Sequence, residues 1–464
     1  MSQDIAFTLA EYAASLKCKD LPPSAVTATK ENIFDTLTCA TSGSTAPGIG
    51  EMMSLVDEWG GTPQATSLVF GKKYPAHHAA WLNSAMAHAN DFDDTHDKAM
   101  LHAGVPVIPA ALAATELKGE VSGEDFLAGV AAGLDIICRL GLSTTIGIVA
   151  SGWIYTSLLG YFGATAAAGR IMGLSKEEMV NAFGIAYSQC AGTYQPIRDS
   201  AITKRMQPGF AAKGALISVQ MAKKGIYGVQ NTFQGVDGFY RVYLQNQAKP
   251  EVAIQDLGVR FEQEMLSYKP YPCCRVNHTS IDAAIEAKKK WNLSPEQIRK
   301  VEMRVNKHYY SACCTPIDVR KAPRSPVEAQ FSTPYTVAAG LLYGRVGLAD
   351  FTKEGIKRKE VLDLAARVDG VLDEEIEKMS SAQMSPVVIR IETVDGKVHE
   401  LRMEHTLGSP EKPMTQANFD AKLADCITFS AKPLPEANRL RSIVEGLETL
   451  PDVKKLIGIL SNPN

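Results

Sequence analysis

The sequence has little net charge. Its 464 residues include 48 Lys and Arg against 51 Asp and Glu, which gives a formal net charge of −3. This balance provides no extended positive field to hold nucleic acid or an anionic membrane surface. We therefore expect neither nucleic acid nor membrane among the partners, and any anion must bind at a local cluster of cations.

Cysteine is scarce as well. Nine cysteines are too few and too scattered for a disulfide scaffold, and the adjacent pairs Cys273-Cys274 and Cys313-Cys314 match neither a zinc nor an iron–sulfur spacing. The first residues, MSQDIAFTLAEYAASLK, lack the basic start and apolar core of a signal peptide. These features predict reduced thiols and a cytoplasmic location.

Charged residues are missing altogether between Arg139 and Arg170. A membrane-spanning helix needs about 20 mostly apolar residues, but this segment carries six glycines and seven serines or threonines. We therefore expect a buried helix, a tight loop and a second buried helix.

Helical periodicity dominates the first two-thirds of the chain and returns from Gln416 onward. Ser122 and Ser175 begin capping-box patterns directly before apolar periodic runs. Gly225 is a natural C-cap for the helix that precedes it. These signals predict a large helical domain.

The pattern changes after about residue 269. Val301–Val305 alternates like a half-buried strand, and residues 386–402 predict a hairpin that turns at Asp395-Gly396. The expected fold is mainly α, with a discontinuous all-helical domain of residues 1–268 and 409–464 and an inserted, smaller α+β domain of residues 269–408.

The densest polar cluster is Asn90-Asp-Phe-Asp-Asp-Thr-His-Asp97, followed by Lys98 and His102. Three interpretations compete. Asp91 to Thr95 fits the Asp-x-Asp-x-Thr pattern of a phosphotransferase, but helix-forming residues stand where that chemistry needs a buried strand, and the chain has no glycine-rich phosphate loop. A metal site that includes His96 and His102 stays open as an alternative, but no EF-hand or zinc spacing supports it, and we expect no metal.

The third interpretation is a general acid–base cluster, and it agrees best with the cations elsewhere in the chain. Lys204 and Arg205 directly precede a helix whose N-terminus attracts anions. Lys269 and Arg275 lie at the predicted domain junction, a common place for ligand sites. Converging cations beside a positioned base are what the abstraction of a proton alpha to a carboxylate requires.

These segments together resemble the MmgE/PrpD family over nearly the whole length. The matching motifs are Asp91-Phe-Asp-Asp-Thr95 followed by His102, Gly160–Gly169 leading to Gly173-Leu-Ser175, Lys204-Arg-Met-Gln-Pro-Gly209, Lys269-Pro-Tyr-Pro-Cys-Cys-Arg275, Ala329-Gln-Phe-Ser332 with Pro334-Tyr335, and the segment from Gly408 to Met414. Each motif is weak alone, but their order and spacing are specific.

The resemblance implies a cofactor-independent enzyme that acts on a small di- or tricarboxylate. The family includes 2-methylcitrate dehydratases, cis-aconitate decarboxylases and iminodisuccinate epimerases. The resemblance also implies a homodimer, in which each subunit combines a discontinuous helical domain with a chorismate-mutase-like α+β lid and holds a positively charged site between them.

Site residues of the family's decarboxylases carry over to Asp91, Thr95, His102, Lys204, Lys269 and Tyr310, or Tyr309 in place of Tyr310. One position departs from the pattern. Where many relatives have a Gly-aromatic-His-Pro-Thr segment, this chain has Gly152-Trp-Ile-Tyr-Thr156, so that Ile154 replaces a site histidine and Tyr155 stands beside it. Gln207 likewise replaces a common histidine.

We expect a lyase of the 2-methylcitrate dehydratase type, with His102 as the principal acid–base and Asp91 orienting it. The remaining roles are substrate carboxylate binding by Lys204, Lys269, Arg205 and Arg275, and substrate hydrogen bonding by Thr95, Tyr155 and Tyr310. The alternatives are a cis-aconitate-type decarboxylase, a two-base epimerase or isomerase that uses His102 and Tyr155, and a non-catalytic polycarboxylate-binding protein.

Overall fold

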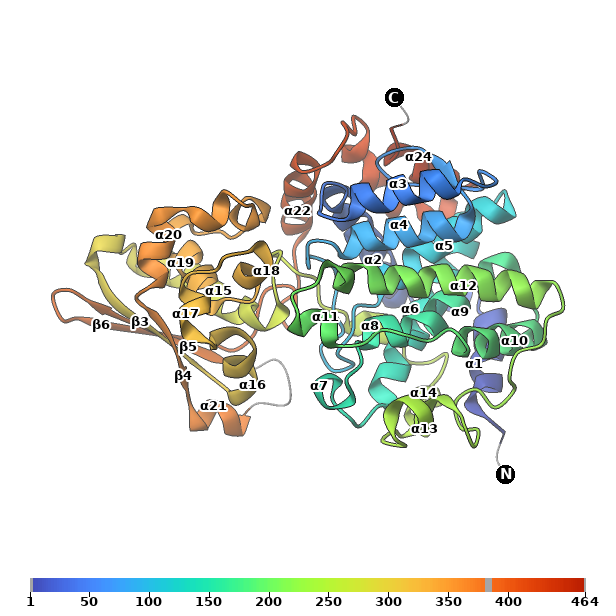
Figure 1. Cartoon of the computed structure of the whole chain (residues 1–464), viewed down its shortest axis with the longest axis horizontal. Helices are drawn as coiled ribbons and strands as arrows, with labels where there is room; N and C mark the ends of the chain where they lie inside the picture. The colour runs from blue at the N-terminus through green and yellow to red at the C-terminus, as the bar shows by residue number, and fades with distance from the viewer. Residues whose placement is uncertain (1–2, 380–385, 463–464) are drawn as a thin grey trace. The chain divides into compact units, whose positions relative to one another are not determined.

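The computed structural model describes residues 3–379 and 386–462, which form two compact units (Figure 1). The first unit comprises the described residues of Met1–Ala89, Asp93–Leu266 and Cys426–Asn464, and the second comprises Asn90–Phe92 and those of Ser267–Asp425. Helices dominate and the one larger sheet lies in the second unit. The predicted mainly α fold with a smaller α+β part is therefore confirmed.

The first unit is helical apart from the two-residue strands β1 (Ala65–Thr66) and β2 (Lys73–Tyr74) and isolated bridges. Its helices are α1 (Ile5–Ser15), α2 (Pro23–Gly43), α3 (Ile49–Trp59), α4 (Ala76–His88), α5 (Gly104–Lys118), α6 (Gly123–Ser143), α7 (Ile148–Ser151), α8 (Tyr155–Leu158), α9 (Gly160–Met172), α10 (Lys176–Tyr187), α11 (Gln195–Arg198), α12 (Gln207–Lys223), α13 (Phe239–Leu244), α14 (Pro250–Ile254), α23 (Leu440–Glu445) and α24 (Lys454–Ile459).

The centre of the first unit is formed by α5, α6 and α9, with α4 and α12 packed beside them. Gly133 of α6 and Gly163 of α9 face each other so closely that a Cβ on either would lie within 3 Å of the other's carbonyl oxygen. Only glycine allows two helices to approach to this extent. Gly163, one of the six glycines that argue against a membrane span, thus serves helix packing.

The uncharged segment forms the end of α6, the short helices α7 and α8, and then α9. The two buried helices are confirmed, but the predicted tight loop between them is wrong, because residues 144–159 contain the two short helices. Of the described helices, α6 alone is long and apolar enough to cross a membrane, and 94% of its most apolar window is buried within the protein. Such burial is typical of the core helix of a globular protein.

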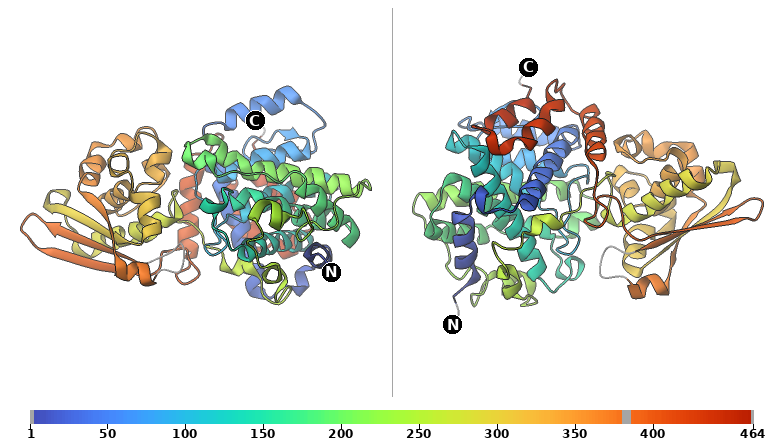
Figure 2. Two further views of the ribbon diagram at one scale, coloured as in Figure 1. Left: turned by 60° about the horizontal axis from the view of Figure 1, so that its bottom comes forward. Right: turned by 180° about the vertical axis from the view of Figure 1, so that it is seen from behind.

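The second unit is built on a four-stranded sheet of order β4-β3-β5-β6. β3 (Ile298–Val305) pairs in parallel with β4 (Val368–Leu372) and antiparallel with β5 (Val387–Thr393), and β5 forms the predicted hairpin with β6 (Val398–Met403). Val301 and Met303 of β3 are buried against the helical layer, which gathers on one face of the sheet (Figure 2).

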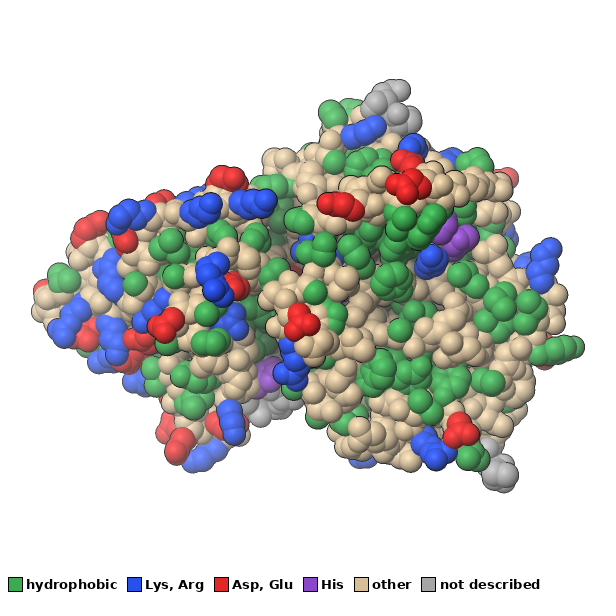
Figure 3. All heavy atoms as spheres, in the orientation of Figure 1, with side chains coloured by type: hydrophobic (Ala, Val, Ile, Leu, Met, Phe, Trp, Pro, Cys, Tyr) green, Lys and Arg blue, Asp and Glu red, His purple; other side chains and the backbone are tan. Residues whose placement is uncertain are grey.

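The helices of this unit are α15 (His278–Trp291), α16 (Lys307–Tyr309), α17 (Ile317–Lys321), α18 (Pro326–Gln330), α19 (Thr333–Tyr343), α20 (Lys359–Ala365) and α21 (Glu374–Met379). α15 and α19 pack against each other and on the sheet. α22 (Gln416–Thr428) begins in the second unit and ends in the first. On the face drawn in Figure 3, charges of both signs are intermixed over the second unit, in line with the low net charge.

Candidate active site

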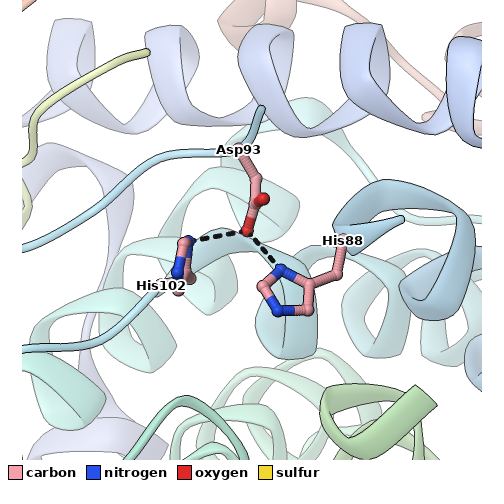
Figure 4. A group of neighbouring side chains, drawn as sticks. All are labelled: His88, Asp93 and His102. Carbon is pink, nitrogen blue, oxygen red and sulfur yellow. Dashed lines mark hydrogen bonds and ion pairs between the residues drawn. The ribbon is translucent and has the colours of Figure 1, made fainter. Parts of the chain in front are cut away.

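Three side chains of the first unit meet around one carboxylate oxygen (Figure 4). His88 is the last residue of α4, Asp93 lies in the loop that follows, and His102 stands shortly before α5. Nδ1 of His88 donates a hydrogen bond of 2.8 Å to Oδ2 of Asp93, and Nδ1 of His102 lies 2.9 Å from the same oxygen. Asp93 therefore holds both imidazole rings, and we call these residues the His–Asp–His triad.

The three members of the triad differ in exposure. The side chains of His88 and Asp93 are 1% and 0% exposed, whereas that of His102 is 17% exposed. A small molecule can reach only a group that is open to the surface, so His102 is the member of the triad that a small molecule can reach. His88 and Asp93 support it from within the protein.

The triad carries a permanent negative charge on Asp93. Burial opposes ionisation of this carboxyl, but the two histidine rings outweigh that effect and hold the pKa of Asp93 well below its usual range. Burial lowers the pKa of His88 to about 4 against the pull of Asp93. His88 is consequently neutral near pH 7 and donates its Nδ1–H, so that Asp93 keeps its charge for His102.

The loop that carries His102 is fixed by its neighbours. Asp94 accepts hydrogen bonds from the backbone N–H groups of Ala103 and Gly104, at 2.8 and 3.1 Å, at the start of α5. Thr156 accepts a bond of 2.9 Å from the N–H of His102 itself. A carboxylate at a helix N-terminus satisfies exposed donors and favours the helix dipole. His102 is thus held in place by backbone contacts as well as by Asp93.

A second arrangement of charge lies within the second unit, around the short segment Asn90–Phe92. Its three consecutive carbonyl oxygens each accept a hydrogen bond from a side chain of that unit, Asn90 from Gln330, Asp91 from Lys269 and Phe92 from Lys422. Lys269 also pairs with Oδ1 of Asp91 at 2.9 Å, and its side chain is 1% exposed. We call this group the carbonyl clamp.

Metal binding was considered for the triad, because it is the only group of histidines and carboxylates in the described residues whose possible ligand atoms lie close together, within 4.8 Å. A metal ion needs three lone pairs that converge on one point between the ligands. Here both ring nitrogens instead approach one oxygen at the distances of N–H···O contacts. The arrangement fits a hydrogen-bonded triad better than a metal centre.

Comparison with known proteins identifies the family. The MmgE/PrpD N-terminal domain matches residues 8–251, and the MmgE/PrpD C-terminal domain matches residues 271–449. The chain belongs to the MmgE/PrpD family. The predicted resemblance is therefore confirmed, and the triad and the clamp are features of a member of this family.

The similar proteins of known activity are lyases. A cis-aconitate decarboxylase from Aspergillus terreus is 25% identical over 477 residues, which cover 98% of this chain and 95% of the relative, and the human cis-aconitate decarboxylase is 25% identical over 480 residues, or 100% and 96%. A 2-methylcitrate dehydratase from Escherichia coli K12 is 24% identical over 210 residues, or 44% and 43%. The prediction of a lyase is confirmed at this level.

Several residues predicted from the MmgE/PrpD motifs lie in the first unit with the triad. Lys204, half-buried in the 3-10 turn before α12, contributes positive charge to the surroundings of His88. Its neighbour Arg205 donates to the carbonyl of Pro47 at 3.5 Å. Thr95 is buried and its hydroxyl donates to Asp97 at 3.0 Å.

The second unit contains the other predicted cations. Lys269 and Arg275 both act electrostatically on the buried ring of His278, where burial first, and then these two cations, hold the pKa well below its usual range. Because Lys269 binds Asp91 as well, the structure brings Asp91, Lys269 and Arg275 together.

Asp91 does not have the contact predicted for it. The sequence assigns Asp91 to orient His102, but the carboxylate on His102 is Asp93, and Oδ1 of Asp91 pairs with Lys269. The backbone turns at Asp91, whose φ of 53° is left-handed, so that Asp91 and Asp93 point to different neighbours.

Tyr155 also differs from the prediction. Its side chain is fully buried, and its hydroxyl donates a short bond of 2.5 Å to the carbonyl oxygen of Ile146. Burial raises the pKa of this tyrosine above 10. A phenol that is enclosed, bonded to a carbonyl and harder to ionise than usual does not suit an acid–base role.

The two candidate tyrosines of the second unit are also distinct. Tyr309 is buried, with its hydroxyl bonded to Ser280 at 2.6 Å and its pKa raised well above 10 by burial. Tyr310 begins a π-helical turn and is partly exposed. Exposure therefore favours Tyr310, the first choice from the family motif, as the one that can meet a ligand.

His88 and Asp93 are the members of the site that sequence reasoning missed. A histidine in the alanine-rich stretch before Asn90 looks like one polar residue of a helix, and Asp93 is visible only as part of a motif. The usable signal was the spacing, because a histidine at the end of a helix and a carboxylate five residues later can fold back on each other.

Proposed function

We propose that this protein is a cofactor-independent lyase that acts on a small di- or tricarboxylate, with His102 transferring a proton at a carbon next to a carboxylate. The observation that carries the proposal is the triad, in which the one partly exposed imidazole rests on a buried, ionised carboxylate. This arrangement holds Nδ1 toward Asp93 and leaves Nε2 to give or take a proton.

Decarboxylation is the better supported of the two lyase reactions. The cis-aconitate decarboxylases are similar to this chain over nearly its whole length, whereas the 2-methylcitrate dehydratases match less than half of it. This order reverses the preference drawn from the sequence. When a carboxylate beside a double bond leaves as CO₂, its electron pair stays on the carbon skeleton, and protonated His102 would supply the proton that forms the new C–H bond.

Positive charge for the substrate carboxylates is available beside the triad. Lys204 is half-buried and close enough to influence the protonation of His88. An ammonium group in a partly dehydrated setting attracts a carboxylate more strongly than one in water. We assign Lys204 and Arg205 to substrate binding. Tyr310, which is partly exposed, keeps the binding role predicted for it, whereas Lys269, Arg275 and Thr95 are buried and are not assigned to substrate binding.

The epimerase alternative loses support. It requires a base on each face of the substrate carbon, and Tyr155 was the second candidate. The hydroxyl of Tyr155 is bonded to Ile146, and Ile154 is buried with no group that carries a proton. One acid–base residue is sufficient for a lyase. A cytoplasmic homodimer remains part of the proposal.

The test is turnover of a panel of acids by the purified full chain, followed by proton NMR and CO₂ release. The panel contains cis-aconitate, 2-methylcitrate, citramalate, tartrate and iminodisuccinate. We expect loss of CO₂ from cis-aconitate and a rate reduced at least about 10²-fold in His102→Gln. The matched control is His405→Gln at an exposed histidine of the second unit, which should retain the full rate. Binding without turnover would instead indicate a non-catalytic polycarboxylate-binding protein.

A further inference from the structure

His88 is a buried titratable residue to which the proposed reaction gives no role. Its ring packs edge-on against that of His102, with centroids 4.8 Å apart and planes at 71°. Both rings approach Oδ2 of Asp93, while Oδ1 accepts no hydrogen bond from any described residue. Two imidazoles therefore share a single acceptor atom.

We propose that His88 is a positioning residue, which holds Asp93 in place and limits how strongly that carboxylate attracts the proton of His102. The inference rests on the proposed function of His102 for its catalytic meaning. The structural basis is the shared oxygen, since an acceptor that already takes one hydrogen bond is a weaker partner for a second donor.

The two contacts to Oδ2 are unequal. The His88 bond is well formed at 2.8 Å, whereas His102 lies at 2.9 Å but its Nδ1–H is poorly aligned with the oxygen. The hydrogen bond from His88 to Asp93 is thus the better formed of the two, and the contact of His102 with Asp93 is weaker.

The charges around His88 keep it a neutral donor. Burial is the largest influence and Lys204 and His102 act with it, while Asp93 opposes them. Asp94, which is buried beside Asp93, adds a further carboxyl to this environment, and burial raises its pKa. A neutral His88 can donate only through Nδ1 to Asp93, so it lowers the effective negative charge that His102 senses without adding a positive one.

The experiment compares His88→Asn with His88→Gln in the full chain. The Asn amide stands at the position of Nδ1 and can still donate to Asp93, whereas the Gln amide extends past it toward the position of Nε2. The two variants have the same chemistry and differ in reach. We measure the pH midpoint and tautomer of His102 by NMR of ¹⁵N-labelled histidine, with the His102 signal assigned by its loss in His102→Gln.

We expect His88→Gln to raise the midpoint of His102 by about one pH unit, a tenfold gain in proton affinity, and His88→Asn to leave it near that of the unaltered protein. Equal midpoints in all three proteins, or a lowered midpoint in His88→Gln, would overturn the inference. If His88→Gln does not fold, His88→Leu, which also removes the donor to Asp93, provides the second measurement. It should raise the His102 midpoint by a similar amount, and an unchanged or lowered midpoint would overturn the inference.

This measurement needs no substrate, so its outcome separates from that of the proposed function. If His102 titrates as expected but no acid is turned over, the lyase proposal is refuted and the positioning role of His88 stands. If turnover depends on His102 but the His102 midpoint does not change when His88 is replaced, only the positioning role of His88 is refuted.

Discussion

The buried ion pair between Asp91 and Lys269 gives a quantitative prediction about the second unit. Lys269 donates to both the carbonyl and the Oδ1 of Asp91, each at 2.9 Å, and the side chain of Lys269 is 1% exposed and that of Asp91 11%. Asp91 also has a left-handed backbone, with φ of 53°. The perturbations are Asp91→Ala, Asp91→Asn, Lys269→Met and the double variant Asp91→Asn with Lys269→Met.

The variants should lower the unfolding free energy by different amounts, because each removes different contacts. Loss of one partner of a buried pair costs about 3–5 kcal/mol, and alanine in the left-handed region adds about 1 kcal/mol, so Asp91→Ala should lose about 4–6 kcal/mol of unfolding free energy. Asparagine tolerates this backbone and keeps an acceptor oxygen, so Asp91→Asn should lose about 2 kcal/mol. Lys269→Met should lose about 3 kcal/mol. Because the double variant leaves no isolated charge, it should lose about 2 kcal/mol less than the sum of its two single changes.

The assay is hydrogen exchange by mass spectrometry at increasing urea, read in peptides that cover residues 267–275. This region reports the second unit by itself, whereas a whole-chain signal would mix two units. Costs that simply add in the double variant would refute the account of Asp91 and Lys269 as a coupled buried pair.

Three further predictions concern the first unit. Unfolded His88 gains a proton below pH 6.5 but folded His88 only near pH 4, so the unfolding free energy should fall by about 3 kcal/mol as the pH drops through this window. Urea midpoints measured across this pH range should show that His88→Asn removes this loss of stability. An equal pH dependence in the unaltered protein and the variant would contradict the prediction. Tyr155→Phe leaves the carbonyl of Ile146 without its donor and should cost about 1–2 kcal/mol in urea melts, while a rate loss beyond about tenfold would restore Tyr155 as an acid–base residue. Asp94→Ala should cost about 1–2 kcal/mol and speed amide exchange at Gly104, and unchanged exchange there would argue against the cap.

Much of the fold is predictable because its signals are local. The capping box at Ser175 forms as the sequence indicates, and the helix that follows ends at Tyr187. The hairpin forms at Asp395-Gly396 as predicted, but its loop has three residues, 394–396, in place of the two expected, and it ends on Gly396 with a positive φ of 84°. Composition does not distinguish α6 from a membrane span, but its burial and the close packing of Gly133 against α9 do.

The site is less predictable because the sequence does not show which of its side chains will contact one another. The motif places Asp91, Asp93 and Asp94 within four residues. Asp91 nevertheless pairs with Lys269, Asp93 contacts two histidines, and Asp94 caps α5. Nothing in the local pattern assigns these partners. Burial decides the role of Tyr155 in the same way, since its hydroxyl is occupied by a carbonyl that lies nine residues earlier.

The most direct test of the central claim is turnover in deuterated water with His102 intact and replaced. The account predicts that the product, or recovered substrate, acquires carbon-bound deuterium from the solvent, and that His102→Gln loses turnover and deuterium incorporation together. Full turnover in a folded His102→Gln protein, or a product formed without solvent deuterium on carbon, would contradict it.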